Sequence, residues 1–398
     1  MTPRTNLFFL NAGHFLDHFF LLIFPTAVIT LHKTWDMDYG SALALGTPAF
    51  AAFAIGTLPA GWLGDRWSRT GMMAVFFIGI GASSIATGFA RGPMTLMIGL
   101  GGLGLFAAIF HPVGLAMVTD ASDRPGRTLA VNGIFGNMGL AGAALITGLL
   151  TDQLGWRWAF ILPGMFSVAV GGAYLLVLNN ARRTAAHAHA AIQTQPILDA
   201  SRSDRLRVIA LIGISALFGG FIFNGVTVSL PKLFEERLSD VVTNLTGVGA
   251  AASMVFAIAA FAQLPVGNLL DRFGAKPILL GVLTAQMAFL LIVGTGSGIA
   301  STIAAAPMLL AIFGALPITG WLMAHYVPSA WRARAFAVEY VLSLGVGSLA
   351  LLLISALHNR GGFETLYLLL AAAAVIVFIA ACSLPGLAKP APAPIAAE

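Results

Sequence analysis

The sequence predicts an all-α integral membrane protein of twelve transmembrane helices, arranged as two six-helix bundles. Three observations carry this prediction. Of the 398 residues, 58% are hydrophobic and only 9% are charged, whereas about 25% of an average soluble domain is charged. Apolar stretches long enough to cross a bilayer recur along the whole chain. The two halves of the chain also repeat each other's motifs.

The apolar stretches each approach or exceed the roughly 20 residues that a helix needs to cross the hydrocarbon core. They cover residues 6–30, 42–63, 71–90, 94–119, 128–150, 156–178, 208–231, 245–269, 277–296, 301–326, 335–356 and 363–384.

Basic residues are distributed unevenly between the two sides of these predicted helices. Of 21 Lys and Arg residues, six fall on the side opposite the N-terminus: Lys33, Arg91, Arg157, Lys232, Arg237 and Arg360. Because basic residues favour the cytoplasmic side, we expect both termini in the cytoplasm and the protein in the cytoplasmic (inner) membrane.

Composition divides the chain into four parts. We expect a first six-helix bundle over 1–180 and a polar cytoplasmic linker over 181–207. A second six-helix bundle is expected over 208–385, followed by a disordered cytoplasmic tail over 386–398 that is rich in Pro and Ala.

An internal repeat relates the two halves. The segment Thr57-Leu-Pro-Ala-Gly-Trp-Leu-Gly-Asp-Arg66 aligns with Gln263-Leu-Pro-Val-Gly-Asn-Leu-Leu-Asp-Arg272, and Pro25 aligns with Pro231 at the same offset of 206 residues. Duplicated halves of this kind are typical of transporters, whose substrate site lies near the midplane where the halves meet. We therefore expect two bundles related by a pseudo-twofold axis.

The loop between predicted helices 2 and 3 carries a family resemblance. Gly61-Trp-Leu-Gly-Asp-Arg-Trp-Ser-Arg69 resembles the signature loop of the major facilitator superfamily, with Ser68 where that pattern usually has Gly. Gly155-Trp-Arg-Trp-Ala-Phe160 is a second feature common in this family. The resemblance implies the major facilitator fold and secondary active transport by alternating access.

Within that family, Phe110-His-Pro112 and Gly136-Asn-Met-Gly139 are similar to exporters of the fosmidomycin-resistance type. This similarity implies proton-coupled efflux of a drug or metabolite. Two features depart from proton-coupled drug antiporters, because helix 4 has no arginine between Leu100 and Phe110 and helix 5 has no Gly-Pro pair.

A cluster of ionisable residues marks predicted helix 1. Asp17 is the only carboxylate near the middle of a predicted helix, and its spacing from His14 and His18 places all three on one helix face. Because ionisable groups inside a membrane are costly and usually functional, we interpret these three as the proton-coupling residues. Two alternatives stay open: hydrogen bonds that only fix helix packing, and ligands for a divalent metal ion.

Other polar residues inside the predicted helices are candidates for the substrate cavity. The family geometry lines the cavity with helices 1, 4, 7 and 10, which brings His111 near the helix 1 cluster. Pro112 removes a backbone donor, so helix 4 should kink or open there. The candidates are Asn11, His111, Asn132, Asn137, Asn224, Thr227, Gln263 and Thr319.

Charged residues at the cytoplasmic helix ends form a predicted gate. The resemblance implies that Asp65 approaches the positive N-terminal end of helix 11 and so bridges the two halves. The full set is Asp65, Arg66, Arg69, Arg127, Asp271, Arg272, Arg334 and Glu339.

Several functional classes are disfavoured. The Gly-x-Ser-x-Gly, His-Glu-x-x-His and Walker A patterns are absent from the sequence, so we expect no enzyme and no cofactor. The single Cys382 disfavours a cysteine metal site. The expected partners are a small-molecule substrate, protons and the lipid bilayer, with no nucleic acid and a monomeric state. A divalent-metal transporter or a facilitated uniporter remains an alternative.

Overall fold

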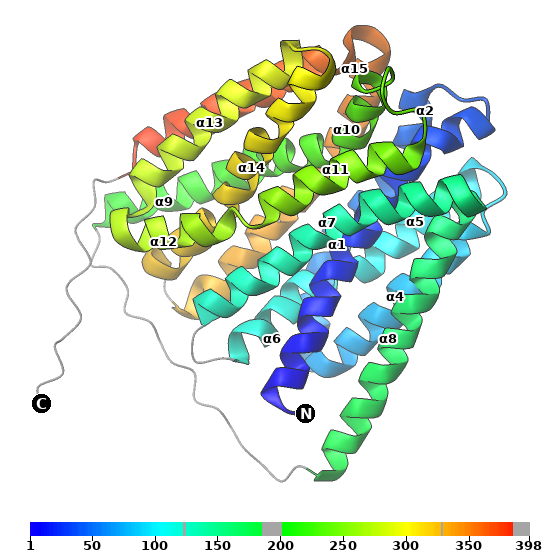
Figure 1. The fold of residues 1–398 in the computed structure, drawn as a ribbon. Coiled ribbons are helices and arrows are strands. Elements are labelled where there is room, and N and C mark those ends of the chain that lie inside the picture. Colours follow the sequence, from blue (N-terminus) through cyan, green and yellow to red (C-terminus); the bar gives the residue numbers. More distant parts are fainter. Residues whose placement is uncertain (122–124, 185–200, 328, 385–398) are drawn as a thin grey trace, which may run out of the picture.

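A computed structural model describes the chain apart from residues 122–124, 185–200, 328 and 385–398 (Figure 1), and gives no side-chain description for 125–127, 181–184, 329–334 and 337. Every regular element in these described residues is helical. In the first half these elements are α1 (Pro3–Thr34), α2 (Tyr39–Ala44), α3 (Thr47–Arg66), α4 (Arg69–Gly88), α5 (Pro93–Ala107), the π-helix η1 (Phe110–Gly114), α6 (Leu115–Asp120), α7 (Pro125–Leu154) and α8 (Trp156–Thr184).

The second half has the same character. Its elements are α9 (Arg202–Ile214), the π-helix η2 (Ser215–Gly219), α10 (Gly220–Arg237), α11 (Leu245–Ala260), α12 (Gln263–Phe273), α13 (Ala275–Thr295), α14 (Gly298–Tyr326) and α15 (Ser329–Cys382). Short elements join into single spans, as α5, η1 and α6 do between Pro93 and Asp120.

Eleven helical stretches of the described chain are long and apolar enough to cross a membrane. The last of them lies within α15, whose 54 residues are interrupted by Gly362 in a non-helical conformation (φ 60°, ψ −161°). A left-handed φ of this kind suits Gly, which has no Cβ. Because Gly362 separates two membrane-length helices, the prediction of twelve transmembrane helices is confirmed.

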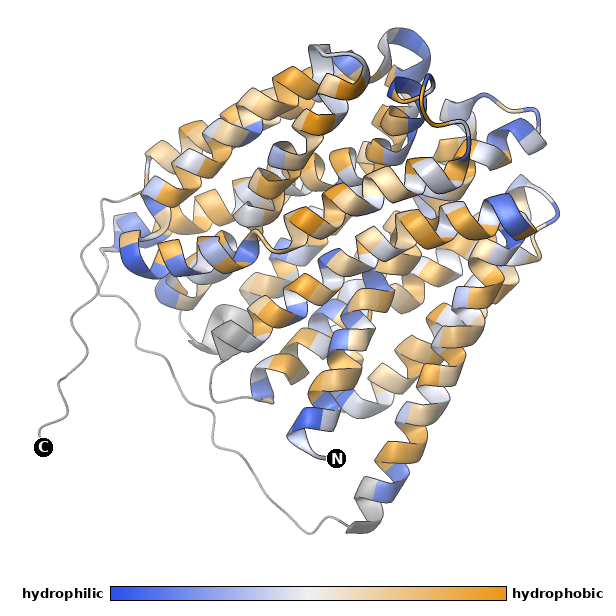
Figure 2. Ribbon diagram, viewed as in Figure 1, coloured by the Kyte–Doolittle hydropathy of each residue, from blue (hydrophilic) through white to orange (hydrophobic). Residues whose placement is uncertain are grey.

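The surface of the bundle is that of a membrane protein. Large apolar side chains on the helices are exposed, among them Ile55 (75%), Leu176 (68%) and Ile303 (68%). Figure 2 shows apolar residues along the lengths of the helices and hydrophilic residues gathered mainly toward the helix ends. Lipid is the solvent that such a surface needs.

Two helix pairs make the most extensive contacts between the halves. α7 packs against α11, and α3 packs against α15; Figure 1 shows α7 and α11 side by side. We call the end of the bundle where α1 begins the proximal end, and the end where α1 stops the distal end. α7 and α11 approach closely near the distal end, where Gly148 faces the carbonyl oxygen of Leu245 and Gly249 faces that of Ala144.

The predicted helix boundaries differ from the observed ones at the linker. α8 continues to Thr184, and α9 begins at Arg202, where the Ser201 side chain accepts a hydrogen bond from the backbone of Asp204. A Ser N-cap satisfies a helix-end donor and so starts the helix before the first apolar residue. The rest of the predicted linker, and the predicted tail 386–398, lie outside the described residues, and the domain division itself stays a prediction.

Candidate functional site

The helix 1 cluster lies inside the first half of the bundle. His14, Asp17 and His18 all belong to α1, and Asp17 is fully buried. His14 is also buried, whereas His18 is partly exposed. The i, i+3, i+4 spacing therefore places the three side chains on one helix face as predicted, and that face is turned into the protein.

His111 joins this cluster from η1. Its Nε2 lies 3.2 Å from Oδ2 of Asp17, and both side chains are buried. Neither oxygen of Asp17, nor Nδ1 of His111, has a hydrogen bond of regular geometry in the described residues. This buried carboxylate thus has an imidazole as its close ionisable partner.

The backbone around His111 is a single π-helical turn, Phe110–Gly114, which contains Pro112. Proline cannot donate a backbone hydrogen bond, so the helix must widen or kink at this point. The opening predicted for helix 4 is therefore present, and it takes the form of a π-helix. Single π-helical turns inside α-helices are frequently found at functional sites.

A chain of amides holds His14. Its Nδ1 lies 2.8 Å from Oδ1 of Asn132 on α7, and the Asn132 amide nitrogen donates to Oδ1 of Asn11 at 2.9 Å. The His14 ring also stacks on Phe110, with centroids 4.8 Å apart. The contacts bring two predicted cavity residues, Asn11 and Asn132, into the support of His14.

A small cavity of about 40 Å³ lies between the two halves. It is lined by side chains of α1, α3, η1, α7, α10 and α15: His18, Leu21, Leu22, Phe50, His111, Leu140, Phe223, Asn224, Thr227, Val228 and Leu344. Four of the residues predicted from the sequence, His18, His111, Asn224 and Thr227, thus share one cavity. Most of its wall is apolar.

The polar residues on α10 are partly engaged by the backbone. The Asn224 amide nitrogen donates to the carbonyl oxygens of Gly220 and Ser343, and the Thr227 hydroxyl donates to that of Phe223. The second of the Asn224 contacts joins α10 to α15. The side-chain oxygen of Asn224 is the group left to face a substrate.

Three other predicted cavity residues do not line this cavity in the described part of the chain. Asn137 is buried on α7 with its amide nitrogen unpartnered, and Gln263 is buried against Gly133. Thr319 pairs with Glu339 and with the carbonyl oxygen of Leu316. The sequence identified these polar residues, but it did not determine how each helix is rotated, and the rotation decides whether a side chain faces the cavity.

Sequence reasoning missed the aromatic residues around the cluster. Tyr340 of α15 lies over His111, with ring centroids 4.7 Å apart, and Phe223 of α10 lies 6.4 Å from His18. Both come from the second half of the chain. An aromatic residue in an apolar helix cannot be distinguished from its neighbours by polarity. The only signal in the sequence was the position of these residues on helices that were expected to face the cavity.

At the proximal end, each described contact of a predicted gate residue stays within one half of the chain. Arg69 pairs with Asp65 and with Asp120, each at 2.8 Å. Arg66, Asp271 and Arg272 are exposed. The side chains of Arg127 and Arg334 are not among those that the structure describes. Glu339 contacts Thr319. The gate role of these residues stays a prediction.

Polar contacts between the halves gather instead at the distal end, and the sequence did not predict them. Asp152, on the last turn of α7, accepts hydrogen bonds from the backbone of Leu245 and Thr246 and from the Thr246 hydroxyl. A carboxylate at this position caps the N-terminus of α11. The contact ties the first half to the second.

Two further contacts cross the distal end. Lys33 pairs with Glu235 at 3.1 Å, and Asn359 donates to Asp38 at 2.7 Å. Hydrogen bonds from Ser41 and Asn359 hold the pKa of Asp38 at about 2, below its usual value. Asp38 is therefore charged at neutral pH, and its acceptor role is lost only as the pH falls through about 2. The distal end is closed in this structure.

Comparisons with known proteins agree with this architecture. Residues 7–240 match the sequence pattern of the Major Facilitator Superfamily. A putative metabolite transport protein of Haemophilus influenzae is 26% identical over 391 residues, covering 93% of this chain and 92% of that protein. The puromycin resistance protein pur8 of Streptomyces alboniger is 36% identical over 101 residues, covering 25% of this chain.

Two of the curated relatives match this chain over only part of their own length. The alignment covers 20% of pur8 and 40% of another putative metabolite transport protein. Among solved structures, a bacterial homologue of the human lysosomal transporter Spinster has a TM-score of 0.72 at 16% identity. That comparison covers 96% of this chain and 97% of the homologue, and it shows a shared fold.

Proposed function

Since the chain belongs to the Major Facilitator Superfamily, we propose that it exports a small molecule by alternating access, driven by protons. Family membership makes the protein a multi-pass membrane transporter for a small molecule, and not an enzyme. Proton coupling and the outward direction of transport go beyond what family membership establishes, and they form our proposal.

The observation that carries the proposal is the buried contact between Asp17 and His111. A carboxylate inside a membrane is costly unless it has a function or a partner. Here the partner is an imidazole 3.2 Å away, and that imidazole lines the cavity between the halves. A shared proton can be held while the pair is buried and released when water reaches it. Asp17, with His14 and His18, is therefore our proposed coupling group.

Contacts from the second half give this group a way to sense the transport cycle. Tyr340 lies over His111, and Phe223 lies beside His18. Both belong to helices that must move relative to α1 and η1 when the halves rock against each other. A state change can shift proton occupancy only through contacts that differ between states. These two aromatic contacts are the ones that would differ.

Export is the direction that the sequence predicted, and two observations support it. One is the similarity of Phe110-His111-Pro112 and Gly136-Asn137-Met138-Gly139 to fosmidomycin-resistance exporters. The other is the partial likeness to pur8, whose name states puromycin resistance. The full-length relative is named for metabolite transport. A metabolite or drug is accordingly the proposed cargo class, carried by a monomer.

Reconstitution into vesicles tests the function directly. Purified protein in vesicles with an imposed pH gradient is exposed to puromycin, small organic acids and neutral aromatic metabolites. An internal pH-sensitive dye reports proton movement. We expect at least one compound to move in exchange for protons, in the opposite direction. Movement of compounds that ignores the pH gradient would replace the proposal by a uniporter, and no movement in either vesicle orientation would contradict it.

We propose that the protein lies in the inner membrane and that both of its termini are in the cytoplasm. Cys382 is the only cysteine, so a Cys382→Ser background is free of thiols. In that background, Ser239→Cys on the exposed α10–α11 loop should react with an impermeant maleimide added to whole cells. Ala190→Cys in the predicted linker should react only after lysis. Labelling of position 190 in intact cells would reverse the orientation.

A further inference from the structure

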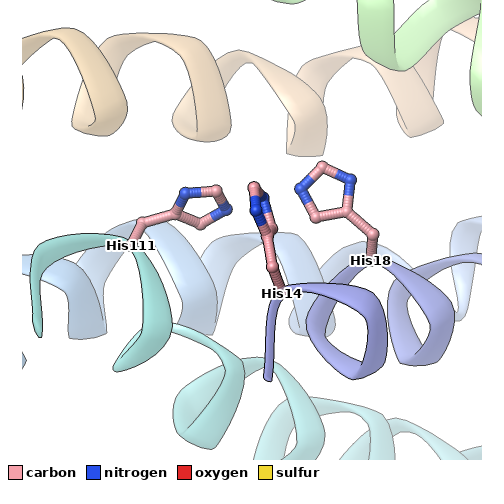
Figure 3. A group of neighbouring side chains, drawn as sticks. All are labelled: His14, His18 and His111. Carbon is pink, nitrogen blue, oxygen red and sulfur yellow. The ribbon is translucent and has the colours of Figure 1, made fainter. Parts of the chain in front are cut away.

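Three histidines meet beside the cavity. His14 and His18 of α1 and His111 of η1 each offer one ring nitrogen, and these nitrogens lie within 4.8 Å of one another. Figure 3 shows the three rings turned toward a common centre. Positively chargeable groups repel one another in a low-dielectric interior, so three imidazoles gathered this closely need a reason.

A second observation points to a ligand at the same place. Oδ1 of fully buried Asp17 and Nδ1 of buried His111 have no hydrogen-bond partner in the described residues, whereas Oδ2 of Asp17 has Nε2 of His111 at 3.2 Å. Buried polar atoms in folded proteins nearly always have a partner, and a bound ion is one accepted explanation for an exception. Three neutral imidazoles can each supply one ligand nitrogen to a cation, and the Asp17 carboxylate beside His111 supplies a negative charge.

We propose that His14, His18 and His111 bind a divalent transition-metal ion of the zinc, cobalt and nickel class, with Asp17 as the carboxylate partner of His111, and that this ion is a second cargo in addition to the organic compound of the proposed function. Imidazole and carboxylate ligands suit these metals. In a tetrahedral site with bonds of about 2.0–2.1 Å, ligand nitrogens lie about 3.4 Å apart. Small side-chain rotations bring nitrogens within 4.8 Å to that spacing.

The supporting contacts are those that metal-binding histidines normally have. Such histidines usually hold one ring atom against a carboxylate or amide, which fixes the ring and the tautomer. His14 lies against Asn132 at 2.8 Å, and His111 lies against Asp17 at 3.2 Å. Gly136 adds a steric constraint, because a Cβ there would lie 2.5 Å from Nε2 of His14. The rings are thus oriented without a metal.

The position of the site favours a cargo over a structural ion. Structural zinc sites are closed by four protein ligands, whereas three ligands leave a position open. His18 and His111 line the cavity between the halves, which is where the proposed transporter would hold its substrate. The one cysteine of the chain, Cys382, is exposed at the end of α15, so thiolate ligation for a soft metal is absent here. The cargo assignment rests on the proposed function, but the binding site does not.

Binding is measured on the purified, full-length protein after removal of any histidine tag. Co²⁺ serves as the probe, because its visible spectrum reports nitrogen ligation, and Zn²⁺ is the competitor. We expect one Co²⁺ per chain and at least tenfold weaker binding in His18→Ala and His111→Ala. Asn132→Ala should weaken binding roughly 10–100-fold by releasing His14. Size-exclusion profiles and thermal unfolding establish that each variant is folded.

Matched controls come from the second half of the chain, away from the proposed metal site. His325→Ala removes a histidine that stacks on Trp321 of α14, and Gln286→Ala removes a buried amide that donates to Ala311. Both should bind Co²⁺ as the wild type does. If folded wild-type protein binds no Co²⁺, or if His18→Ala and His111→Ala bind as tightly as wild type, the site is overturned.

Vesicle flux then separates the two proposals. Zn²⁺ movement, read by an enclosed indicator and lost in His18→Ala, supports the cargo assignment. Metal binding without Zn²⁺ flux overturns that assignment. Proton-coupled movement of an organic compound by a wild-type protein that binds no metal overturns the inference while the proposed function stands. Metal binding by a protein that shows no proton-coupled transport supports the metal site and contradicts the proposed function.

Discussion

Replacing Asp17 by Asn is expected to abolish proton-driven transport while the protein still inserts and folds. The substitution keeps the size of the side chain and removes its negative charge and its capacity to gain a proton. Asp17 is fully buried and contacts His111, so the loss falls on a group that water and lipid cannot replace. A coupling residue is needed for net transport against a gradient, but exchange of substrate at equal concentrations needs no net proton movement.

The measurement compares two assays in the same vesicles. Gradient-driven accumulation should fall to the level of empty vesicles, and exchange of labelled substrate at saturating concentration should persist. Asp240→Asn, an exposed acid on the α10–α11 loop, is the matched control and should behave as wild type. Full proton-driven transport by Asp17→Asn would make Asp17 a packing residue. Loss confined to divalent-metal flux would assign it to the metal site alone.

The fold followed from the sequence because lipid imposes a simple rule. A helix satisfies its own backbone, and a run of about 20 apolar residues is what crosses the bilayer, so span number and approximate extent can be read from hydropathy. The opening at Pro112 was predictable for a similarly local reason, since proline removes a donor wherever it stands. Its form as a π-helix was not.

The candidate site followed only in part. The shared face of His14, Asp17 and His18 depends on spacing within one helix, which a sequence states directly. The approach of Asn132 to His14 and of Tyr340 to His111 depends on how separate helices rotate and pack, and spacing along the chain does not determine that. The distal contacts are harder still. Asp152 reaches Thr246 because the last turn of α7 lies beside the first turn of α11, and no sequence motif indicates that.

The second large effect is expected at the distal contact between α7 and α11. A Cβ added at Gly249 would lie 2.2 Å from the carbonyl oxygen of Ala144, and one at Gly148 would lie 2.4 Å from that of Leu245. Both obstacles are backbone atoms, which cannot rotate away as a side chain can. Gly249→Ala should therefore force the two helices apart near the end that Asp152 closes. Overpacking of this kind costs about 1–3 kcal/mol.

That cost applies only while the distal end is closed, so it shifts the balance between conformations. About 1.4 kcal/mol changes an equilibrium tenfold, and we expect the distal-open population of Gly249→Ala to rise by roughly that factor or more. Val228, which lines the cavity, supplies the reporter as Val228→Cys in the Cys382→Ser background. Impermeant maleimide added from the distal side should label it about ten times faster in Gly249→Ala.

Gly281→Ala provides the matched control, because a Cβ at this exposed α13 position meets nothing within 4 Å. Removing a flexible glycine from a helix stabilises it by about 0.5–1 kcal/mol and should leave the labelling rate unchanged. Equal labelling rates in Gly249→Ala and Gly281→Ala would mean that α7 and α11 do not hold the distal end closed. A faster rate in Gly249→Ala alone would make their close approach the contact that must break when the cavity opens on that side.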